Sequence, residues 1–361
     1  MRLFDGKKVA DKILEDLKKK IGAENLKPKL AVFLIGEDEA SKIYIRLKKE
    51  AAELIGVEFE LFQYDVPYFC HPEPQAKDII GRKNHRDEIL HCVQDDILGK
   101  INELNEDRSV NGIIVQLPLS KGLDKDKILS MVDPRKDVDG FHKENQRLFE
   151  QGRRRFEPVL PTAILMAIED ALGTSLCHSE RSVSKRRISA PTMRSFASAC
   201  NAMPARQPNG SHGGGRSIAG RGVQDDRIQN KKTIALVNSD IFGKTLKLVL
   251  GKKGMDFEYK LTKDFLVSGA KSDLKEADII ITACGRPGLV RGEMIKQGTV
   301  LIDAGIYRAK DGKVVGDIDR PSVESIAGFL TPVPGGIGPL VIALLLQNIY
   351  LAARIALRNY G

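Results

Sequence analysis

The sequence predicts an α/β fold with two parallel sheets, each covered by helices. Strand-like runs alternate with helix-like segments in two successive series, which is the pattern of parallel strands joined by crossover helices. In the second series, residues 278–283 and 299–303 are apolar without alternation, as in strands buried on both faces. The length of 361 residues is sufficient for two domains with cores of their own.

The first series occupies the N-terminal third of the chain. Residues 5–21 are predicted to form an amphipathic helix, because Val9, Ile13, Leu17 and Ile21 recur every four residues. The apolar run at 29–35 ends in a glycine and is predicted to be a strand. The further elements of this series are a helix at 39–55, a strand at 57–63, a helix at 97–106, a strand at 112–116 and a helix at 124–131.

The second series follows from residue 162. Its elements are a helix at 162–172, a strand at 233–237, a helix at 243–253, and strands at 256–260, 278–283 and 299–303. The last two strands each end at a glycine-containing loop, and ligands bind beyond the carboxyl ends of such strands. The apolar stretch at 339–357 is interrupted by Gln347, Asn348 and Arg354, so we expect a packed terminal helix and no membrane span.

Residues 69–96 and 177–230 do not fit this pattern. Both stretches open with Cys-His-x-Glu, and both contain Val-Gln-Asp-Asp near their ends. A Cys/His metal site is one interpretation, but no CxxC pair occurs, so we expect no metal and interpret both as surface insertions. The second is predicted to be largely disordered, since its Gly- and Ser-rich part cannot bury enough apolar surface to fold.

The formal net charge is +9, and much of the excess lies in the second stretch. The milder positive charge of the remainder suits an enzyme with an anionic cofactor and substrate. Nucleic-acid binding through the basic segment 181–227 is an alternative of low weight. Its only aromatic residue is Phe196, so stacking platforms for bases are missing.

Several polar residues are candidates for chemistry. Tyr44 and Lys48 lie four residues apart on a predicted helix and therefore share a face. Gln116 ends a predicted strand and is followed by Leu117-Pro118, which places an amide at the carboxyl edge of the sheet. Taken alone, each pattern favours a structural role: a solvated lysine, a packed tyrosine and a loop-capping glutamine.

Three loops carry further signals. Asp137 and Asp139 flank a valine next to Gly140, and the pattern alone favours a turn over a ligand anchor. The segment 331–339 has three glycines among three prolines before the terminal helix. Glycine permits close backbone approach to a ligand, and a helix N-terminus favours an anion. The segment 237–245 occupies the place of a dinucleotide loop, but it lacks GxGxxG and is a weak signal.

The segments VQLPL, KDVDGF and TPVPGGIGP, in this order, resemble the bifunctional methylenetetrahydrofolate dehydrogenase/methenyltetrahydrofolate cyclohydrolase family. The resemblance covers nearly the whole chain except the two insertions. It implies a folate-binding catalytic domain at 1–157, completed by the helix at 337–361, and a Rossmann-like NAD(P)-binding domain at 158–336. The active site is then expected in the cleft between the two domains. A cytoplasmic homodimer is expected.

The resemblance also implies the activity: oxidation of 5,10-methylenetetrahydrofolate with NAD(P)+ and hydrolysis of the methenyl product to 10-formyltetrahydrofolate. Lys48 matches the catalytic lysine, Tyr44 the tyrosine near the pterin, and Gln116 the glutamine bonded to the lysine. Asp139 matches the aspartate that binds the pterin ring. The residues expected at the folate are Tyr44, Gln116, Leu117, Pro118, Asp139, Pro334, Gly335 and Gly336.

The cofactor loop departs from the family pattern. Val237-Asn238-Ser239 stands where the family has Gly-Arg-Ser, so the arginine that meets the 2′-phosphate of NADP is missing. Lys260 or Lys263 can substitute as a point charge, and NADP is expected ahead of NAD. A cyclohydrolase-dominant enzyme with weak dehydrogenase activity is therefore the alternative. The residues expected at the cofactor are Asn238, Ser239, Ile241, Gly243, Lys260, Cys284, Gly285, Gly305 and Ile306.

Overall fold

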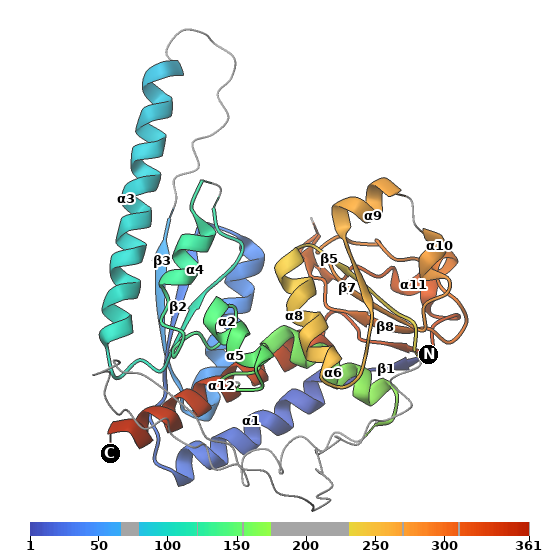
Figure 1. Cartoon of the computed structure of the whole chain (residues 1–361), viewed down its shortest axis with the longest axis horizontal. Coiled ribbons are helices and arrows are strands. Elements are labelled where there is room, and N and C mark those ends of the chain that lie inside the picture. Colours follow the sequence, from blue (N-terminus) through green and yellow to red (C-terminus); the bar gives the residue numbers. More distant parts are fainter. Residues whose placement is uncertain are drawn as a thin grey trace, which may run out of the picture.

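The computed structural model contains two parallel sheets, each flanked by helices, with two long helices running beneath them (Figure 1). It describes residues 1–65, 79–120, 122–153, 155–174, 231–268, 271–309 and 311–360. Residues 177–230 and the first part of 69–96 lie outside the described residues. Three predictions therefore concern residues that the structure does not describe: the disorder of 177–230, nucleic-acid binding by 181–227, and most of the Cys/His candidates for a metal site.

The first sheet has three parallel strands in the order β3-β2-β4. The central strand β2 (Lys29–Ile35) is almost wholly buried, because helices cover both of its faces. The strand at 29–35 and the helix at 39–55 have the predicted bounds. The elements around β2 are α2 (Glu39–Ile55), β3 (Glu58–Tyr64), α3 (Ile79–Glu106), β4 (Gly112–Val115), α4 (Lys125–Met131) and α5 (Lys143–Glu150).

The prediction that the third helix begins near residue 97 is wrong. Helix α3 already begins at Ile79 and extends well beyond the strands of its sheet (Figure 1). Residues of the supposed insertion contact the fold: Leu90 is buried against Gly122, and Gln94 Oε1 accepts a hydrogen bond from the Asp124 amide at 2.8 Å. The C-terminal part of that segment is therefore integrated into the domain.

The second sheet has six parallel strands in the order β1-β11-β8-β7-β5-β6. Its strands are β1 (Arg2–Leu3), β5 (Thr233–Val237), β6 (Glu258–Leu261), β7 (Ile279–Ala283), β8 (Val300–Asp303) and β11 (Phe329–Leu330). The first residues of the chain thus pair with this sheet, and the sequence contained no signal for so short a strand. A hairpin of β9 (Tyr307–Arg308) and β10 (Val314–Val315) stands apart.

Helices cover both faces of the second sheet. One face, with Ala235 and Ile281, packs against α6 (Val159–Ala171) and α8 (Asp240–Gly251). The opposite face, with Leu236 and Ile280, packs against shorter helices. These are α9 (Thr262–Ser268), α10 (Lys271–Leu274) and α11 (Arg320–Val323). Alternate side chains of each strand therefore enter two separate cores.

The terminal helix α12 (Ile337–Tyr360) packs against α1 (Gly6–Ala23), α6 and α2. Among the described helices it alone is long and apolar enough to cross a membrane, and 61% of its most apolar window is buried in the fold. The buried Asn348 Nδ2 donates to the carbonyls of Val138 and Glu157 at 2.8 and 3.0 Å. These bonds fix α12 to the segment that links the two sheets.

Candidate active site

Lys48 lies on the inward face of α2 and is almost completely buried, with 6% of the residue exposed. The Nζ atom donates a hydrogen bond to Gln116 Oε1 at 2.8 Å. Burial lowers the pKa of the Lys48 ammonium group, and the nearby charge of Asp139 partly opposes this shift. The structure therefore holds an amine whose neutral form is favoured by its surroundings.

The side chain of Gln116 has only one orientation that satisfies its neighbours. Its Nε2 donates to the carbonyl of Leu117 at 3.0 Å, so Oε1 faces Lys48. Because a carboxamide oxygen only accepts, it can bond either the ammonium or the neutral amine. The backbone amide of Gln116 donates to Phe33 O at 2.9 Å, which anchors the residue to the end of β2.

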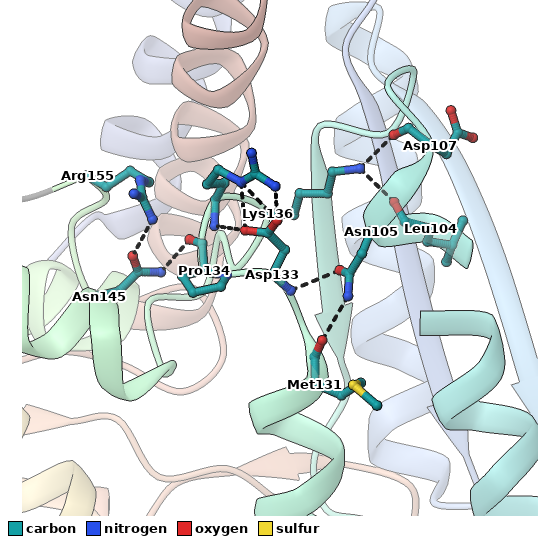
Figure 2. A network of polar contacts seen from close by, with 10 residues as sticks. Leu104, Asn105, Asp107, Met131, Asp133, Pro134, Lys136, Asn145 and Arg155 are labelled. Carbon is teal, nitrogen blue, oxygen red and sulfur yellow. Dashed lines mark hydrogen bonds and ion pairs between the residues drawn. The ribbon is translucent and has the colours of Figure 1, made fainter. Parts of the chain in front are cut away.

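A polar network fixes the loop that follows α4 and carries the two aspartates (Figure 2). Asn105 of α3 accepts a hydrogen bond from the amide of Asp133 at 2.9 Å. Lys136 Nζ donates to the carbonyls of Leu104 and Asp107, both at 2.6 Å, and thereby caps the C-terminal end of α3. The loop is thus held to α3 by bonds that are independent of any ligand.

The two aspartates of this loop differ in their bonding. The buried Asp137 carboxylate accepts from the amide of His142 at 2.8 Å, from Asn145 Nδ2 at 2.9 Å and from the amide of Gly140 at 3.2 Å. The Asp139 carboxylate has no hydrogen-bond partner among the described residues. Burial raises the pKa of Asp139, and the charge of Lys48 opposes that rise. Asp137 therefore builds the turn, and Asp139 remains available to a ligand.

Tyr44 lies one turn before Lys48 on the same face of α2. Burial raises the pKa of Tyr44 to about 12, so the phenol keeps its proton at neutral pH. Its hydroxyl lies against Gly338 in the first turn of α12, where an added Cβ would be 2.9 Å from the oxygen. The tyrosine thus brings α2 next to the glycine-rich segment 331–339.

The loop at Gly335 and Gly336 is seated on the first turn of α1. The amide of Lys7 donates to Gly335 O at 3.1 Å, and a Cβ on Gly6 would lie 1.8 Å from Gly336 O. Gly6 was not among the residues predicted from the sequence. The available signal was its position directly after Asp5. Asp5 caps α1 by accepting a hydrogen bond from the Lys8 amide at 2.9 Å.

Replacing Gly6 with alanine is expected to displace the loop at 335–336, because a methyl group cannot share space with a backbone carbonyl. We expect the free energy of unfolding to fall by about 1–3 kcal/mol, as in other overpacked sites. Urea unfolding measures this loss. The matched control is Gly22→Ala in the same helix, where nothing lies within 4 Å of an added Cβ. Equal effects of the two changes would contradict the packing argument.

On the second sheet, the turn between β5 and α8 is set by Ser239. Its hydroxyl caps α8 by accepting from the Phe242 amide at 3.2 Å. Asn238 donates its amide to Ala283 O at 3.3 Å, which holds the turn beside the end of β7. At Gly243 an added Cβ would be 2.5 Å from the ring of Tyr259, so this glycine permits close packing of α8 on β6.

The loops after β7 and β8 are held by a buried carboxylate that sequence analysis missed. Asp317 accepts from the amides of Cys284 and Arg286 at 2.7 and 2.6 Å. A Cβ on Gly305 would lie 2.0 Å from the Asp317 side chain, so this glycine makes room for the carboxylate. Burial raises the pKa of the Cys284 thiol to about 11, which keeps it protonated. Asp317 follows the hairpin β9–β10, for which no pattern was recognised.

The remaining cofactor candidates lie around the same edge of the sheet. The backbone oxygen of Ile306 faces Gly285, because a Cβ added to Gly285 would lie 3.5 Å from it. Ile241 is 47% exposed in the first turn of α8. Lys260 forms an ion pair with Asp273 of α10. Lys263 is exposed near the start of α9.

Comparisons with known proteins show which family the chain belongs to. The sequence model described as tetrahydrofolate dehydrogenase/cyclohydrolase, catalytic domain, matches residues 4–90 and 80–139, and that of the NAD(P)-binding domain matches residues 222–357. The chain belongs to the tetrahydrofolate dehydrogenase/cyclohydrolase family. The predicted family, the two-domain α/β fold class and the predicted enzyme class are thereby confirmed.

The relatives match over nearly their full length. The bifunctional protein FolD of Nautilia profundicola is 30% identical over 359 residues, which covers 98% of this chain and 98% of the relative. The protein of the same name from Staphylococcus aureus is 31% identical over 358 residues, covering 98% and 96%. The crystal structure of the bifunctional enzyme FolD from Campylobacter jejuni has 28% identity and a TM-score of 0.70, covering 98% and 99%.

The second sheet, in the domain matched as NAD(P)-binding, carries a cavity at its edge. A cavity of about 630 Å³ opens between α9 and the loop after β7, a volume in the range of pockets that take small-molecule ligands. Gly285, with φ of +67°, is part of its lining. Within the described part of the chain, no group of three His, Cys, Asp or Glu side chains is arranged to hold a metal ion.

Proposed function

We propose that Lys48, Gln116 and Asp139 form the centre at which this family member oxidises 5,10-methylenetetrahydrofolate and hydrolyses the methenyl product to 10-formyltetrahydrofolate. The observation that carries the proposal is the buried amine of Lys48, 2.8 Å from Gln116 Oε1 and with a lowered pKa. When bound, NADP supplies the hydride acceptor for the oxidation. NADP is our first choice, with NAD as the second.

In the oxidation, the protein mainly positions the folate. Removal of a hydride from the bridging methylene carbon leaves a cation that the two folate nitrogens stabilise. Asp139 is free to accept hydrogen bonds from the pterin ring, and Tyr44 provides a ring surface next to it. Leu117, Pro118 and the segment 334–336 are proposed to complete the walls of the folate site.

In the hydrolysis, water adds to the cationic methenyl carbon and loses a proton. In its neutral form, which burial favours by lowering the pKa, Lys48 is placed to receive that proton at Nζ. Gln116 keeps the amine in place through Oε1 in both protonation states. Return of a proton to the departing ring nitrogen then breaks the C–N bond. The hydroxyl group left on the carbon releases its proton to water as the C=O bond forms, which leaves the formyl group on N10.

The domain assignment follows the same proposal. Residues 1–157, completed by the helix at 337–361, supply the folate site, and residues 158–336 supply the dinucleotide site. The active site then lies in the cleft between them. The buried linkage through Asn348 supports this division, because it anchors the terminal helix to the segment between the two sheets. A homodimer in the cytoplasm is the proposed working form.

Paired assays on the purified chain test the activity. The absorbance of reduced NADP should increase with methylenetetrahydrofolate as substrate, and the absorbance of methenyltetrahydrofolate should decrease in a separate reaction without cofactor. Both changes are expected from the same preparation. Hydrolysis without any reduction of NADP or NAD would instead reveal a cyclohydrolase alone and would contradict the proposed dehydrogenase activity.

Replacing Gln116 with glutamate is expected to move the pH dependence of hydrolysis. The rate should increase with pH as Lys48 loses its proton, and a carboxylate beside Nζ favours the charged ammonium. The increase should therefore shift to higher pH, by about one to two units. The measurement is the rate of methenyl loss against pH, corrected for the uncatalysed reaction.

The matched control is Gln94→Glu, which changes a glutamine that bonds the Asp124 amide away from Lys48. Its profile should coincide with that of the wild type. An unshifted profile for Gln116→Glu in an active enzyme would show that the titration of Lys48 does not limit hydrolysis.

A further inference from the structure

The usual source of a cation for the 2′-phosphate is absent from the turn between β5 and α8. This turn carries Asn238 and Ser239, and the next residue is the acidic Asp240. Asp240 pairs with Lys244 at 2.6 Å and accepts a hydrogen bond from the Tyr259 hydroxyl at 2.7 Å. The nearest lysine of α8 is therefore already bonded to a carboxylate.

The lysine of β6 is not available either. Lys260 forms an ion pair with Asp273 of the neighbouring helix α10. A phosphate bound there would have to displace a carboxylate from the ammonium group. Lys263 at the start of α9 is exposed, but its ammonium group offers a point charge and no paired donors. A guanidinium group near the carboxyl edge of the sheet is therefore the better candidate for selecting NADP over NAD.

The cavity between α9 and the loop after β7 lies at that edge. Val237 pairs with Leu261 of β6 on one side and with Ala283 of β7 on the other, so these three strands end at the same level. The Thr262 hydroxyl donates to Val237 O at 3.0 Å, which fixes the start of α9 to the end of β5. Ligands of parallel α/β sheets bind at such positions.

The lining of this cavity suits a purine nucleoside with a phosphate group. Phe265 and Leu266 of α9 supply apolar surface on one side, and Pro287 supplies it on the other. Arg286 and Arg291 are also among the lining residues. An apolar slot beside a guanidinium group matches a base next to a phosphate.

The two arginines differ in whether their guanidinium groups already form hydrogen bonds. Arg291 Nε donates to Gly288 O at 3.3 Å. The guanidinium of Arg286 is exposed and has no hydrogen bond or ion pair with the described residues, while its backbone amide is fixed by Asp317 at 2.6 Å. Glu293 is the one carboxylate among the lining residues. Arg286 thus combines a fixed backbone with a guanidinium group that is not bonded to any described residue.

We propose that the cavity between α9 and the loop after β7 takes the adenosine end of the cofactor and that Arg286 selects NADP by binding its 2′-phosphate. This inference rests on the proposed use of NADP. Arg286 takes the role that the missing arginine of the β5–α8 turn would have. A guanidinium can offer two parallel N–H donors to one phosphate, which a point charge cannot.

Calorimetric titration of the full chain with NADP and with NAD tests this proposal without turnover. The wild type should bind NADP at least about tenfold more tightly than NAD, since a hydrogen bond between charged groups is added. Arg286→Gln should weaken NADP binding by about tenfold or more and leave NAD binding within about twofold. Arg291→Gln tests the other arginine of the lining and should keep the preference for NADP over NAD. The control is Arg320→Gln at the exposed start of α11, outside the lining, which should change neither affinity.

Retained NAD binding also shows that the variant has folded. An unchanged ratio of the two affinities in Arg286→Gln, or a loss of NADP preference in Arg291→Gln alone, would overturn the proposal. Equal binding of NADP and NAD by the wild type would also overturn it but would leave the proposed enzyme function intact. Binding of neither dinucleotide by the wild type would contradict the proposed dehydrogenase function itself.

Discussion

Replacing Lys48 with methionine is expected to slow methenyl hydrolysis by about 10²–10⁴-fold, the usual contribution of a positioned acid or base. Methionine is similar in length and apolar, so it suits a position where only 6% of the residue is exposed. Burial disfavours the charged amine, and its removal therefore should not lower the free energy of unfolding. The loss should be specific to catalysis.

The pH dependence of stability gives a second measurement on the same variant. Because the pKa of Lys48 is lower in the folded chain than in the unfolded one, the unfolded chain binds more protons between these two pKa values. The stability of the wild type should therefore increase with pH across that window. The methionine variant should lack this contribution, which urea unfolding at a series of pH values measures.

The control for the Lys48 variant is Lys49→Met. Lys49 is the next residue of α2, lies on its exposed face and is 3.8 Å from Glu53. An exposed pair of this kind contributes little, so activity and stability should both remain close to wild type. Full hydrolytic activity of Lys48→Met would exclude the amine from the mechanism, whatever its position.

Replacing Asp137 and Asp139 separately with alanine is expected to give opposite results. Asp137→Ala leaves the donors of Gly140, His142 and Asn145 without their acceptor, and a buried unsatisfied donor costs about 1–3 kcal/mol. We expect a loss of about 2–4 kcal/mol in the free energy of unfolding after partial rescue by water. Asp139→Ala removes a carboxylate whose charge is disfavoured by burial, so stability should be maintained.

The functional effects should be reversed. Asp139→Ala should raise the KM for the folate substrate by about tenfold or more, because a bond to a charged group is lost. Urea unfolding and steady-state kinetics on both variants measure the two effects. A stable Asp137→Ala variant, or a destabilised Asp139→Ala variant with a normal KM, would show that the roles of the two carboxylates have been misassigned.

Hydrophobic patterning predicted the central elements because burial leaves a clear signal there. The strand at 29–35 and the helix at 39–55 were found with their predicted bounds, since both bury apolar residues at regular spacing. The start of α3 was missed because its N-terminal part is polar and extends beyond the sheet. The paired strands β1 and β11 have two residues each, too few for any period to show.

Fewer features of the candidate site could be predicted from such patterns. Residue spacing placed Tyr44 and Lys48 on one face, but their proposed roles came from the family resemblance. The choice between Asp137 and Asp139 required the hydrogen bonds of the folded loop. Gly6 and Asp317 were missed because they act on the backbone of segments distant in sequence, which leaves no local motif.

The position of α12 has a consequence for biosynthesis. This helix of 24 residues is synthesised long after α1 and α6, yet it covers apolar surface of both. Until α12 has been made, those surfaces lack this partner and stay exposed to water, where they favour binding to chaperones or self-association. The two halves of the nascent chain therefore acquire a complete interior only once α12 has been made, and termination before α12 would leave both unfinished.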